Sequence, residues 1–214
     1  SQNTSLSLAP SSGNRFSKKI SARGYGLTIG SHNLVVTLNG RRLNNIDTSG
    51  PEIAGVNIND IERVEITKGS GSVIYGDSAM AGAIHFYTKK NIQTKISTTS
   101  GNYGVSQTSA SVGINDEKID LNISLDNSKH DGFHKAATGG VKDKGKQTKS
   151  SIGGTYTTDG GTEISLDLYR TNSDIRYPNY LSDAQFEADP TGSGSGSRYT
   201  YRDAEASTTN FKVK

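Results

Sequence analysis

Two histidines, His130 and His134, are the residues of this chain with the clearest capacity for chemistry, because two imidazoles can bind one metal ion. They lie four residues apart in the segment HDGFH. That spacing brings two side chains onto one face only in a helix. Gly132 and its polar surroundings indicate a loop, so we interpret both histidines as ordinary loop residues. His32 and His85 are isolated, and the sequence therefore predicts no metal site and no bound cofactor.

The carboxylates and hydroxyls form no recognisable catalytic group. Asp116 and Glu117 lie in a predicted turn, whereas Asp120 and Asp126 alternate with apolar residues along a predicted strand. Nothing pairs these carboxylates for general acid–base catalysis, and no Ser-His-Asp order can be recognised. The G-x-G segment at 24–26 leads into no predicted helix, which excludes a nucleotide site of that type. We predict that the chain is not an enzyme.

Composition narrows the class of protein. The 24 basic and 21 acidic residues give a net charge of +3, too small an excess to indicate a nucleic-acid partner. Hydrophobic residues make up 31% of the chain, beside 25 glycines and no cysteine. Such low apolar content indicates either partial disorder or a membrane β-barrel, whose strands need an apolar residue only at every second position. No run of about 18 apolar residues is present, so no transmembrane helix is expected.

Alternation of apolar and polar residues favours the barrel. It is clearest over 119–126, where isoleucine and leucine alternate with aspartate, asparagine and serine. Shorter or weaker versions of the pattern predict further strands at 92–100, 105–114, 148–158, 162–171 and 207–213. Dyad alternation is typical of barrel strands, which are apolar toward lipid and polar toward the lumen.

The connections between these predicted strands also have an informative order. They run short, short, long, short and long, so both long connections lie at the same end of an up-and-down meander. Outer-membrane barrels have short turns on the periplasmic side and long loops on the extracellular side. The order of the connections is therefore the order that such a barrel requires.

The stretch 58–88 is organised differently. Val64 and Ile66 alternate with polar residues as in a half-buried strand, glycine and serine interrupt the chain at 69–72, and 84–87 reads as a second strand. Between them, the small residues at 79–83 allow close approach of neighbouring backbones. We predict a compact β-rich unit.

Residues before this stretch extend the unit. The apolar run 34–38 predicts a buried strand, and Asn39-Gly40 after it predicts a hairpin turn. Asn59 or Asp60 is suited to cap one helical turn ahead of the strand at 64–67. The polar segment 1–19 is predicted to be a loose, loop-like lead-in.

The run IERVEITKGSGSVIYGDSAMAGAIHFYTKK, residues 61–90, resembles the end of the plug domain of TonB-dependent outer-membrane receptors. That family's pattern reads roughly IERIEVLRGPGSVLYGxGAxGGVINIITK. SARGYG at 21–26 resembles its IRGFG strand end, and LVVTLNGRRL at 34–43 resembles its LVLVDGVPL strand. RYPNYLSDAQFEADP at 176–190 is similar to LPGxLSxAQFxADP in some iron-complex receptors. The chain departs from the pattern at Lys68, where the family usually has arginine, and at 85–87, where HFY replaces Asn-Ile-Ile.

The resemblance implies a mainly β fold in two parts. Residues 1–89 would form a plug domain, a small mixed β-sheet. Residues 90–214 would form about six antiparallel strands at the start of a large transmembrane β-barrel. Long extracellular loops are expected at about 127–147 and 172–206. The implied location is the outer membrane of a Gram-negative bacterium, with the plug facing the periplasm.

The resemblance also implies two groups of site residues. Loops at the plug apex would reach the ligand, and the residues there that can supply a donor, a charge or an aromatic face are Tyr25, His32, Arg41, Arg42 and Glu52. A buried charge must be paired, so charged plug residues are candidates for locking the plug to the barrel. These are Arg23, Glu62, Arg63, Glu65 and Lys68. For both groups the alternative is an ordinary solvated surface residue.

By resemblance, the protein is a receptor for energy-coupled uptake of a scarce ligand. A ferric siderophore or other iron complex is expected first, with haem, cobalamin or another metal chelate as alternatives. The implied partners are a TonB-type energy transducer of the inner membrane, the chelate and outer-membrane lipid. Two other classes remain open: a soluble secreted β-rich binding or adhesion module, which needs a dry core between two sheets, and a gated channel or signalling receptor on the same scaffold.

Overall fold

The computed structural model describes residues 6–11, 14–22, 33–44, 56–68, 79–90, 93–135, 143–177, 181–192 and 200–213. The chain divides into two compact units, one of residues 1–11 and 17–90 and the other of residues 12–16 and 91–214. Each is described by itself. No helix in the described part of the chain is long and apolar enough to cross a membrane.

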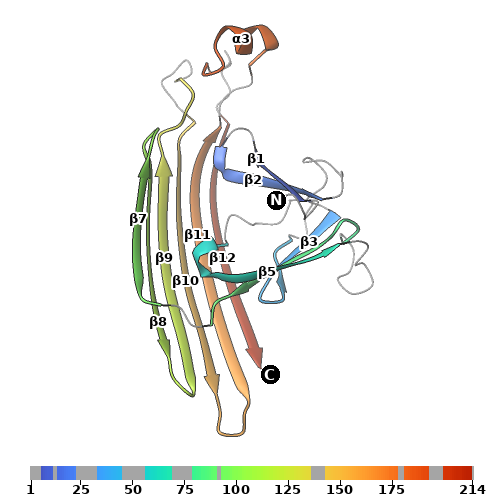
Figure 1. Cartoon of the computed structure of the whole chain (residues 1–214), viewed down its shortest axis with the longest axis vertical. Coiled ribbons are helices and arrows are strands. Elements are labelled where there is room, and N and C mark those ends of the chain that lie inside the picture. The colour runs from blue at the N-terminus through green and yellow to red at the C-terminus, as the bar shows by residue number, and fades with distance from the viewer. Residues whose placement is uncertain are drawn as a thin grey trace. The chain divides into compact units, whose positions relative to one another are not determined.

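The first unit is built on a four-stranded mixed sheet (Figure 1). Its strands are β3 (Leu34–Leu38), β4 (Arg41–Arg42), β5 (Ile61–Lys68) and β6 (Gly82–Thr88), in the order β4-β3-β6-β5. β3 and β6 are parallel, whereas β4 pairs antiparallel with β3 and β5 pairs antiparallel with β6. The small mixed sheet expected from the sequence is therefore present.

Strands also occur where the sequence predicted a loose lead-in. β1 (Leu6–Ser11) and β2 (Asn14–Ala22) form a two-stranded sheet, so the loop-like interpretation of 1–19 was wrong. These strands contain four serines, two lysines and one arginine and have no sustained apolar alternation. Their backbone pairing therefore left little signal in the sequence.

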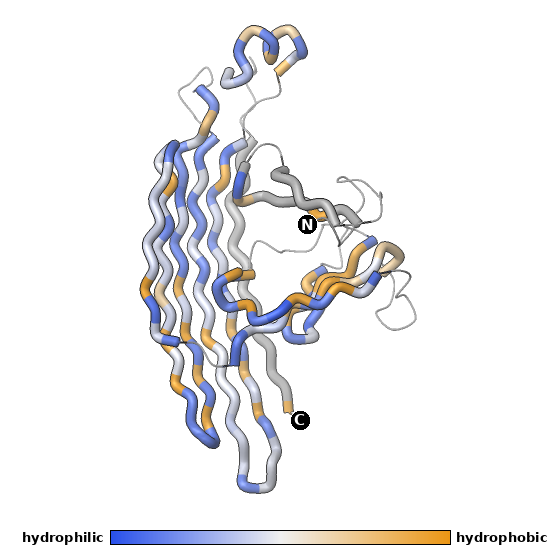
Figure 2. The backbone as a smooth tube through the Cα atoms, viewed as in Figure 1, coloured by the Kyte–Doolittle hydropathy of each residue, from blue (hydrophilic) through white to orange (hydrophobic). Residues whose placement is uncertain are grey.

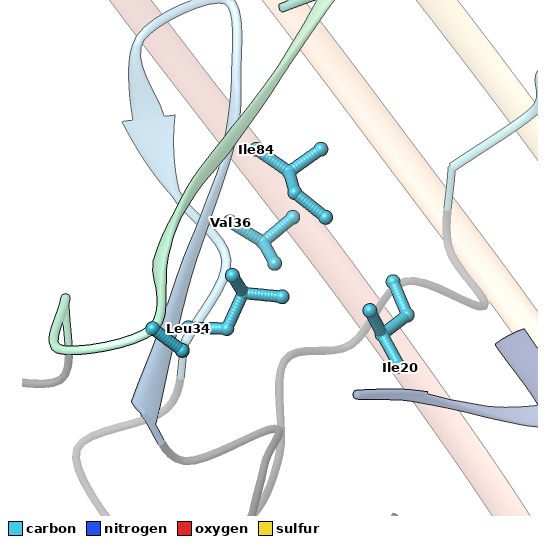
Figure 3. Close-up of a cluster of buried hydrophobic side chains, with 5 residues drawn as sticks. Ile20, Leu34, Val36 and Ile84 are labelled. Atoms are coloured by element: carbon cyan, nitrogen blue, oxygen red, sulfur yellow. The ribbon is translucent and has the colours of Figure 1, made fainter. Parts of the chain in front are cut away.

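The core of the first unit lies on the two faces of β3, whose five residues are all buried. Leu34 and Val36 pack with Ile20 of β2 and Ile84 of β6 on one face (Figure 3). Val35 points to the opposite face and packs with alanines. A central strand that is covered on both faces reads as a continuous apolar run, which is why its bounds matched the prediction.

Backbone geometry in this unit depends on two small turns. Asn39 and Gly40 have φ values of 52° and 85°, as the predicted two-residue hairpin turn requires. A helical turn, η3 (Ile58–Asp60), precedes β5. Its cap is Asn57, whose side chain accepts a hydrogen bond from the Asn59 amide, so the predicted cap at Asn59 or Asp60 was wrong by two or three positions.

The second unit is a six-stranded antiparallel meander (Figure 1). Its strands pair in chain order: β7 (Lys95–Gly101), β8 (Val105–Asn115), β9 (Ile119–His130), β10 (Gly145–Thr157), β11 (Glu163–Tyr177) and β12 (Thr200–Val213). The connections at 116–118 and 158–162 are short and lie at one end, here called the turn end. The long connections from β9 to β10 and from β11 to β12 lie at the other, the loop end, as the order of connections predicted.

Strands β9 to β12 extend further toward the loop end than the sequence indicated. β9 continues to His130, β10 begins at Gly145 and β11 runs to Tyr177. Near the loop end, both faces of these strands are largely polar apart from the buried Ile175, so the ladder of backbone hydrogen bonds continues after the apolar alternation has stopped. One short helix, α3 (Asp183–Ala188), also lies in the connection to β12, where no helix was predicted.

Hydrophobic and hydrophilic residues alternate along much of these strands (Figure 2), so the two faces of the sheet differ in chemistry. Apolar residues of neighbouring strands form rows on one face, the outer face, and the large ones are between 37% and 78% exposed. Two of these rows, set by the strand register, are Val112, Ile123, Ile152 and Leu168, and Ile119, Tyr156, Ile164 and Val213. The opposite, inner face carries serine, threonine, asparagine, glutamine and aspartate. A sheet that is apolar outward and polar inward is the wall of a membrane barrel rather than half of a soluble sandwich.

Candidate functional site

The inner face of the second unit is a polar surface whose groups bond to one another. Asp126 is almost fully buried and accepts hydrogen bonds from Gln107 at 2.7 Å and from Ser128 at 2.6 Å. Ser124 and Ser151 lie 2.7 Å apart on adjacent strands. A buried carboxylate is tolerated only with such partners. The arrangement gives a hydrated lining rather than a hydrophobic core.

At the loop end, Asp143 organises the base of the connection between β9 and β10. Its buried carboxylate accepts the backbone N–H groups of Phe133 at 3.3 Å and His134 at 3.0 Å, and it lies 2.8 Å from Nδ1 of His134. Gly132 has a φ of +91°, and a Cβ there would fall on the Asp143 carboxylate. These contacts hold residues 131–135 in one conformation.

Aromatic rings surround this base. Phe133 packs edge-on against Tyr103 at 5.2 Å and against His134 at 5.4 Å. The Asp131 amide donates to the Tyr103 carbonyl, which joins the β7–β8 turn to the same cluster. His134 is therefore a loop residue as predicted, whereas the same prediction was wrong for His130, a buried residue at the end of β9.

A second contact joins this base to the connection that carries α3. The Lys135 ammonium lies 2.7 Å from the Asp189 carboxylate, and the Lys135 amide donates to the Thr191 carbonyl at 2.7 Å. The hydrogen bond from Lys135, together with those from Thr191, lowers the pKa of Asp189 from 3.8 to about 2. Ser182 and Gln185 cap α3 through a reciprocal capping box. The two long connections are thus in direct contact.

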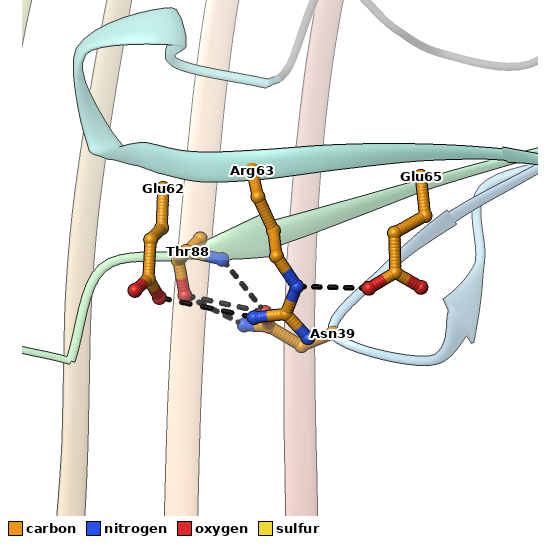
Figure 4. A network of polar contacts seen from close by, with 5 residues as sticks. All are labelled: Asn39, Glu62, Arg63, Glu65 and Thr88. Carbon is orange, nitrogen blue, oxygen red and sulfur yellow. Dashed lines mark hydrogen bonds and ion pairs between the residues drawn. The ribbon is translucent and has the colours of Figure 1, made fainter.

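The predicted locking residues of the described chain lie together on β5, and all are exposed: Glu62, Arg63, Glu65 and Lys68. Arg63 Nε donates to Glu65 at 2.9 Å, and its Nη1 lies 3.9 Å from Glu62 (Figure 4). Its guanidinium also stacks 3.9 Å from the centre of the Tyr87 ring. The hydrogen bond between Arg63 and Glu65 raises the pKa of the Arg63 guanidinium and lowers the pKa of the Glu65 carboxyl group. Arg23 lies outside the described residues.

Next to this cluster, Asn39 links the β3–β4 turn to the end of β6 (Figure 4). Its side chain accepts the Thr88 amide at 3.0 Å and donates to the Thr88 hydroxyl at 2.9 Å. Thr37 and His85 form a further polar pair, 2.8 Å apart and buried between β3 and β6. The role of His85 is therefore structural.

Of the predicted ligand-facing residues, Arg41 and Arg42 are described, and both are exposed on β4 beside the hairpin turn. Tyr25, His32 and Glu52 lie outside the described residues. The ligand-facing and locking roles of all these residues stay predictions. Within the described ranges, no group of three or more histidine or acidic side chains is placed to hold a metal ion.

Asp143 and Asp189 are site residues that sequence reasoning missed. Asp143 lies nine residues from His134 and comes next to it only because the connection folds back. The S-D-A-Q capping pattern at 182–185 was a readable signal for α3. No local pattern indicated the contact between Lys135 and Asp189.

Comparison with known proteins agrees with this architecture. Residues 2–83 match the family model of the TonB-dependent Receptor Plug Domain. The chain is 26% identical over 168 residues to the vitamin B12 transporter BtuB of Vibrio vulnificus (strain YJ016), covering 75% of this chain and 27% of that protein. It therefore spans about a quarter of the length of this relative.

Solved structures show the same fold. The ferric yersiniabactin uptake receptor FyuA from Yersinia pestis superposes with a TM-score of 0.74 at 17% identity, over 98% of this chain and 34% of that one. The FrpB iron transporter from Neisseria meningitidis (F3-3 variant) gives 0.69 at 15% identity, over 99% and 34%. A plug-type mixed sheet followed by wall-type strands defines a class of outer-membrane receptors. Residues 2–83 match the plug domain of TonB-dependent receptors, and the strands that follow them resemble the first wall strands of these receptors.

Proposed function

We propose that the protein containing this chain is an outer-membrane receptor for the energy-coupled uptake of a ferric siderophore or another iron complex. The printed names of similar proteins support a metal-complex cargo: ferric yersiniabactin for FyuA, iron for FrpB and vitamin B12 for BtuB. The family consists of receptors and transporters rather than enzymes. On this proposal, residues 1–89 are the plug and residues 90–214 begin the barrel.

One observation carries the proposal: the plug-type sheet precedes a wall with an apolar outer face and a polar inner face. A soluble sandwich would cover the apolar rows with a second sheet. In the described chain these rows are exposed, while the inner-face Asp126 is buried among hydrogen-bond donors. Such a wall suits lipid on one side and a hydrated interior on the other.

The proposed orientation places the loop end outside the cell and the plug toward the periplasm. Ligand would then meet the two joined connections first, at Asp143 and at the contact between Lys135 and Asp189. Arg41 and Arg42 on the plug would supply positive charge for an acidic chelate. Tyr25, His32 and Glu52 would add an aromatic face, a hydrogen-bond donor and a further charged group. The implied partner on the inner side is a TonB-type energy transducer that pulls on the plug.

The proposed locking of the plug to the barrel by charged residues of β5 agrees with this mechanism, because the ion pairs involved are weak. The pairs of Arg63 with Glu62 and Glu65 are about half exposed, and exposed pairs of this kind contribute little to stability. Contacts this weak can exchange partners when the plug moves. A buried pair that lost its partner would cost about 3–5 kcal/mol.

The proposal is tested by ligand protection in the complete receptor. Purified receptor is incubated with a ferric siderophore panel, haem or cobalamin, and cleavage by protease is followed in the connections at 131–144 and 178–199. We expect a ferric siderophore to slow cleavage there while the turns at 116–118 and 158–162 are unaffected. If only haem or cobalamin slowed cleavage of the connections, that ligand would take the place of the ferric siderophore as the proposed cargo. If none of the three slowed cleavage, the proposed uptake function would be contradicted.

A further inference from the structure

His130 is a buried histidine on the inner face of the second unit, at the end of β9. It follows Asp126 and Ser128 in the alternation of that face, and only 8% of its surface is exposed. Its Nε2 atom is buried and has no hydrogen-bond partner in the described part of the chain. Because a buried polar atom without a partner costs stability, an imidazole in this state points to a partner that binds in another state of the protein.

Gly145 forms a notch beside this imidazole. It is the residue of β10 directly opposite His130. A Cβ at Gly145 would lie 2.8 Å from His130 Nε2, and 2.7 Å and 2.9 Å from two ring carbons of Phe16. Atoms this close overlap, so only glycine leaves room for both rings. The notch is therefore shaped to hold a flat ring beside the imidazole.

The ring that fills the notch comes from a strand that continues into the first unit. Phe16 is among residues 12–16 of the second unit, and its ring centre lies 5.1 Å from that of His130 at an angle of 48°. The same strand, β2, runs on to Ile20, which packs with Leu34 and Val36 in the core of the first unit. Because β2 is continuous, a displacement of the plug sheet that carries Ile20 with it also pulls on Phe16.

The surface exposed by withdrawal of Phe16 has a specific chemistry. It would offer a flat floor at Gly145 and an imidazole nitrogen beside it. A nitrogen of neutral imidazole either donates or accepts a hydrogen bond, depending on the tautomer, and a hydroxyl group can partner it in both cases. A phenol or catechol ring would therefore take the place of Phe16 and add the hydrogen bond that phenylalanine cannot make.

We propose that Phe16 covers a site on the inner wall, formed by Gly145 and His130, which binds an aromatic hydroxyl group of the cargo when β2 withdraws. The inference rests on the proposed uptake function, because the plug must move for the site to open. The phenol or catechol would belong to the organic part of the metal chelate. The site would thus be a contact that the cargo makes inside the barrel, after it has left the loop end.

The site is tested by opening the notch in the complete receptor, held in lipid nanodiscs. Phe16→Ala removes the ring, and fluorine NMR compares the binding of two probes of similar size, para-fluorophenol and para-fluorotoluene. One hydrogen bond in such a site gives roughly a threefold to tenfold difference in affinity. We expect Phe16→Ala to bind the phenol with about this advantage over the toluene. The wild-type receptor, measured as background, should bind neither probe at the notch.

Three further variants assign the binding to the notch. Phe16→Ala/His130→Leu should lose the advantage of the phenol, because it lacks the nitrogen. Phe16→Ala/Gly145→Ala should bind neither probe, because the added Cβ fills the notch. The matched control, Phe133→Ala, removes an exposed ring at the same end of the sheet and should behave like the wild type. Equal binding of the two probes by Phe16→Ala, or an unchanged advantage in the His130→Leu variant, would overturn the proposal.

Withdrawal of Phe16 is tested separately by uptake. Phe16→Cys/Gly145→Cys introduces a disulfide that holds β2 on the wall, in a chain that has no cysteine. We expect the oxidised variant to bind cargo at the cell surface without accumulating it, and reduction to restore accumulation. The control disulfide, Ser124→Cys/Ser151→Cys, joins two wall strands whose hydroxyls lie 2.7 Å apart and should leave uptake unchanged.

Normal accumulation by the oxidised Phe16→Cys/Gly145→Cys variant would overturn the proposal. Absence of accumulation by the wild type would instead contradict the proposed function. The probe measurements do not depend on uptake, so the two failures are distinguishable.

Discussion

Gly82 is the residue at which the first unit tolerates least change. Its φ is +129°, and a Cβ would fall on the Thr67 carbonyl oxygen of the neighbouring strand. We expect Gly82→Ala in the complete receptor to lower the free energy of unfolding of the plug by about 3 kcal/mol or more, because strain and a backbone clash add. Urea unfolding followed by a probe in the plug measures this change.

Gly40 provides the matched control. It also has a positive φ, +85°, but nothing lies within 4 Å of an added Cβ. Gly40→Ala should therefore cost only about 1–2 kcal/mol, the strain of a left-handed residue. Equal losses for the two variants would show that close approach at Gly82 is unimportant.

Arg63 is the residue that tests the locking proposal. Arg63→Lys keeps the charge but removes the planar fork that joins Glu62, Glu65 and the Tyr87 ring. Because the group is exposed, we expect the free energy of unfolding to change little, while uptake falls severalfold. Unchanged uptake would make Arg63 an ordinary surface residue.

At the scale of elements, the base of the β9–β10 connection depends on Asp143. Asp143→Ala leaves the partly buried amides of Phe133 and His134 without their acceptor, which costs up to about 1–3 kcal/mol. We expect faster hydrogen exchange in peptides covering 131–135, measured by mass spectrometry. Asp159→Ala, which removes an exposed pair with Lys118, should leave exchange at 131–135 unchanged. If both variants exchange alike, Asp143 does not organise the connection.

The contact between the two connections should depend on pH in a defined direction. The folded-state pKa of Asp189, about 2, lies below the ordinary value of 3.8. The contact therefore contributes its full stability above about pH 3.8 and loses it as the pH falls toward 2. Hydrogen exchange of peptides covering 183–192, corrected for intrinsic rates, should be constant from pH 7 to 4 and should increase below.

The Asp189→Asn variant separates this effect from general acid unfolding. It should exchange rapidly at every pH, because the amide cannot replace the charged acceptor of Lys135. A transition near pH 6 in the wild type would contradict the assignment to Asp189 and would indicate a histidine instead.

The sequence predicted some elements well and others poorly, for identifiable reasons. β3 was predicted with its observed bounds because a strand buried on both faces is a continuous apolar run. The loop-end extensions of β9 to β12 were missed because strand pairing there is carried by backbone bonds between polar residues. β1 and β2 were missed for the same reason.

The candidate site was predictable to a smaller degree. The charges on β5 and the arginines of β4 could be named from their positions in the plug-like segment. Two contacts could not be predicted: that of Asp143 with His134 and that of Lys135 with Asp189. Both arise because the long connections fold back, and no repeating sequence pattern indicates them.

At the scale of the whole molecule, the outer face must contact lipid. Leu168 lies in an apolar row with Ile123 and Ile152, whereas Ser165 lies on the inner face, 3.0 Å from Thr155. Lysine near the middle of the lipid face of a barrel costs about 2–4 kcal/mol. We therefore expect Leu168→Lys to lower the free energy of unfolding in lipid vesicles by that amount, and Ser165→Lys by clearly less. A larger loss at Ser165 would reverse the assignment of the two faces.

Energy-coupled uptake is the central claim, and it is tested most directly by accumulation of iron in cells. Cells with and without the complete receptor are given a radioactive ferric siderophore, and uptake is followed before and after the proton-motive force is dissipated. We predict saturable accumulation that requires the receptor and stops when the force collapses, while binding at the cell surface persists. Receptor-dependent accumulation that continues without the force would contradict the account, as would the absence of any receptor-dependent accumulation.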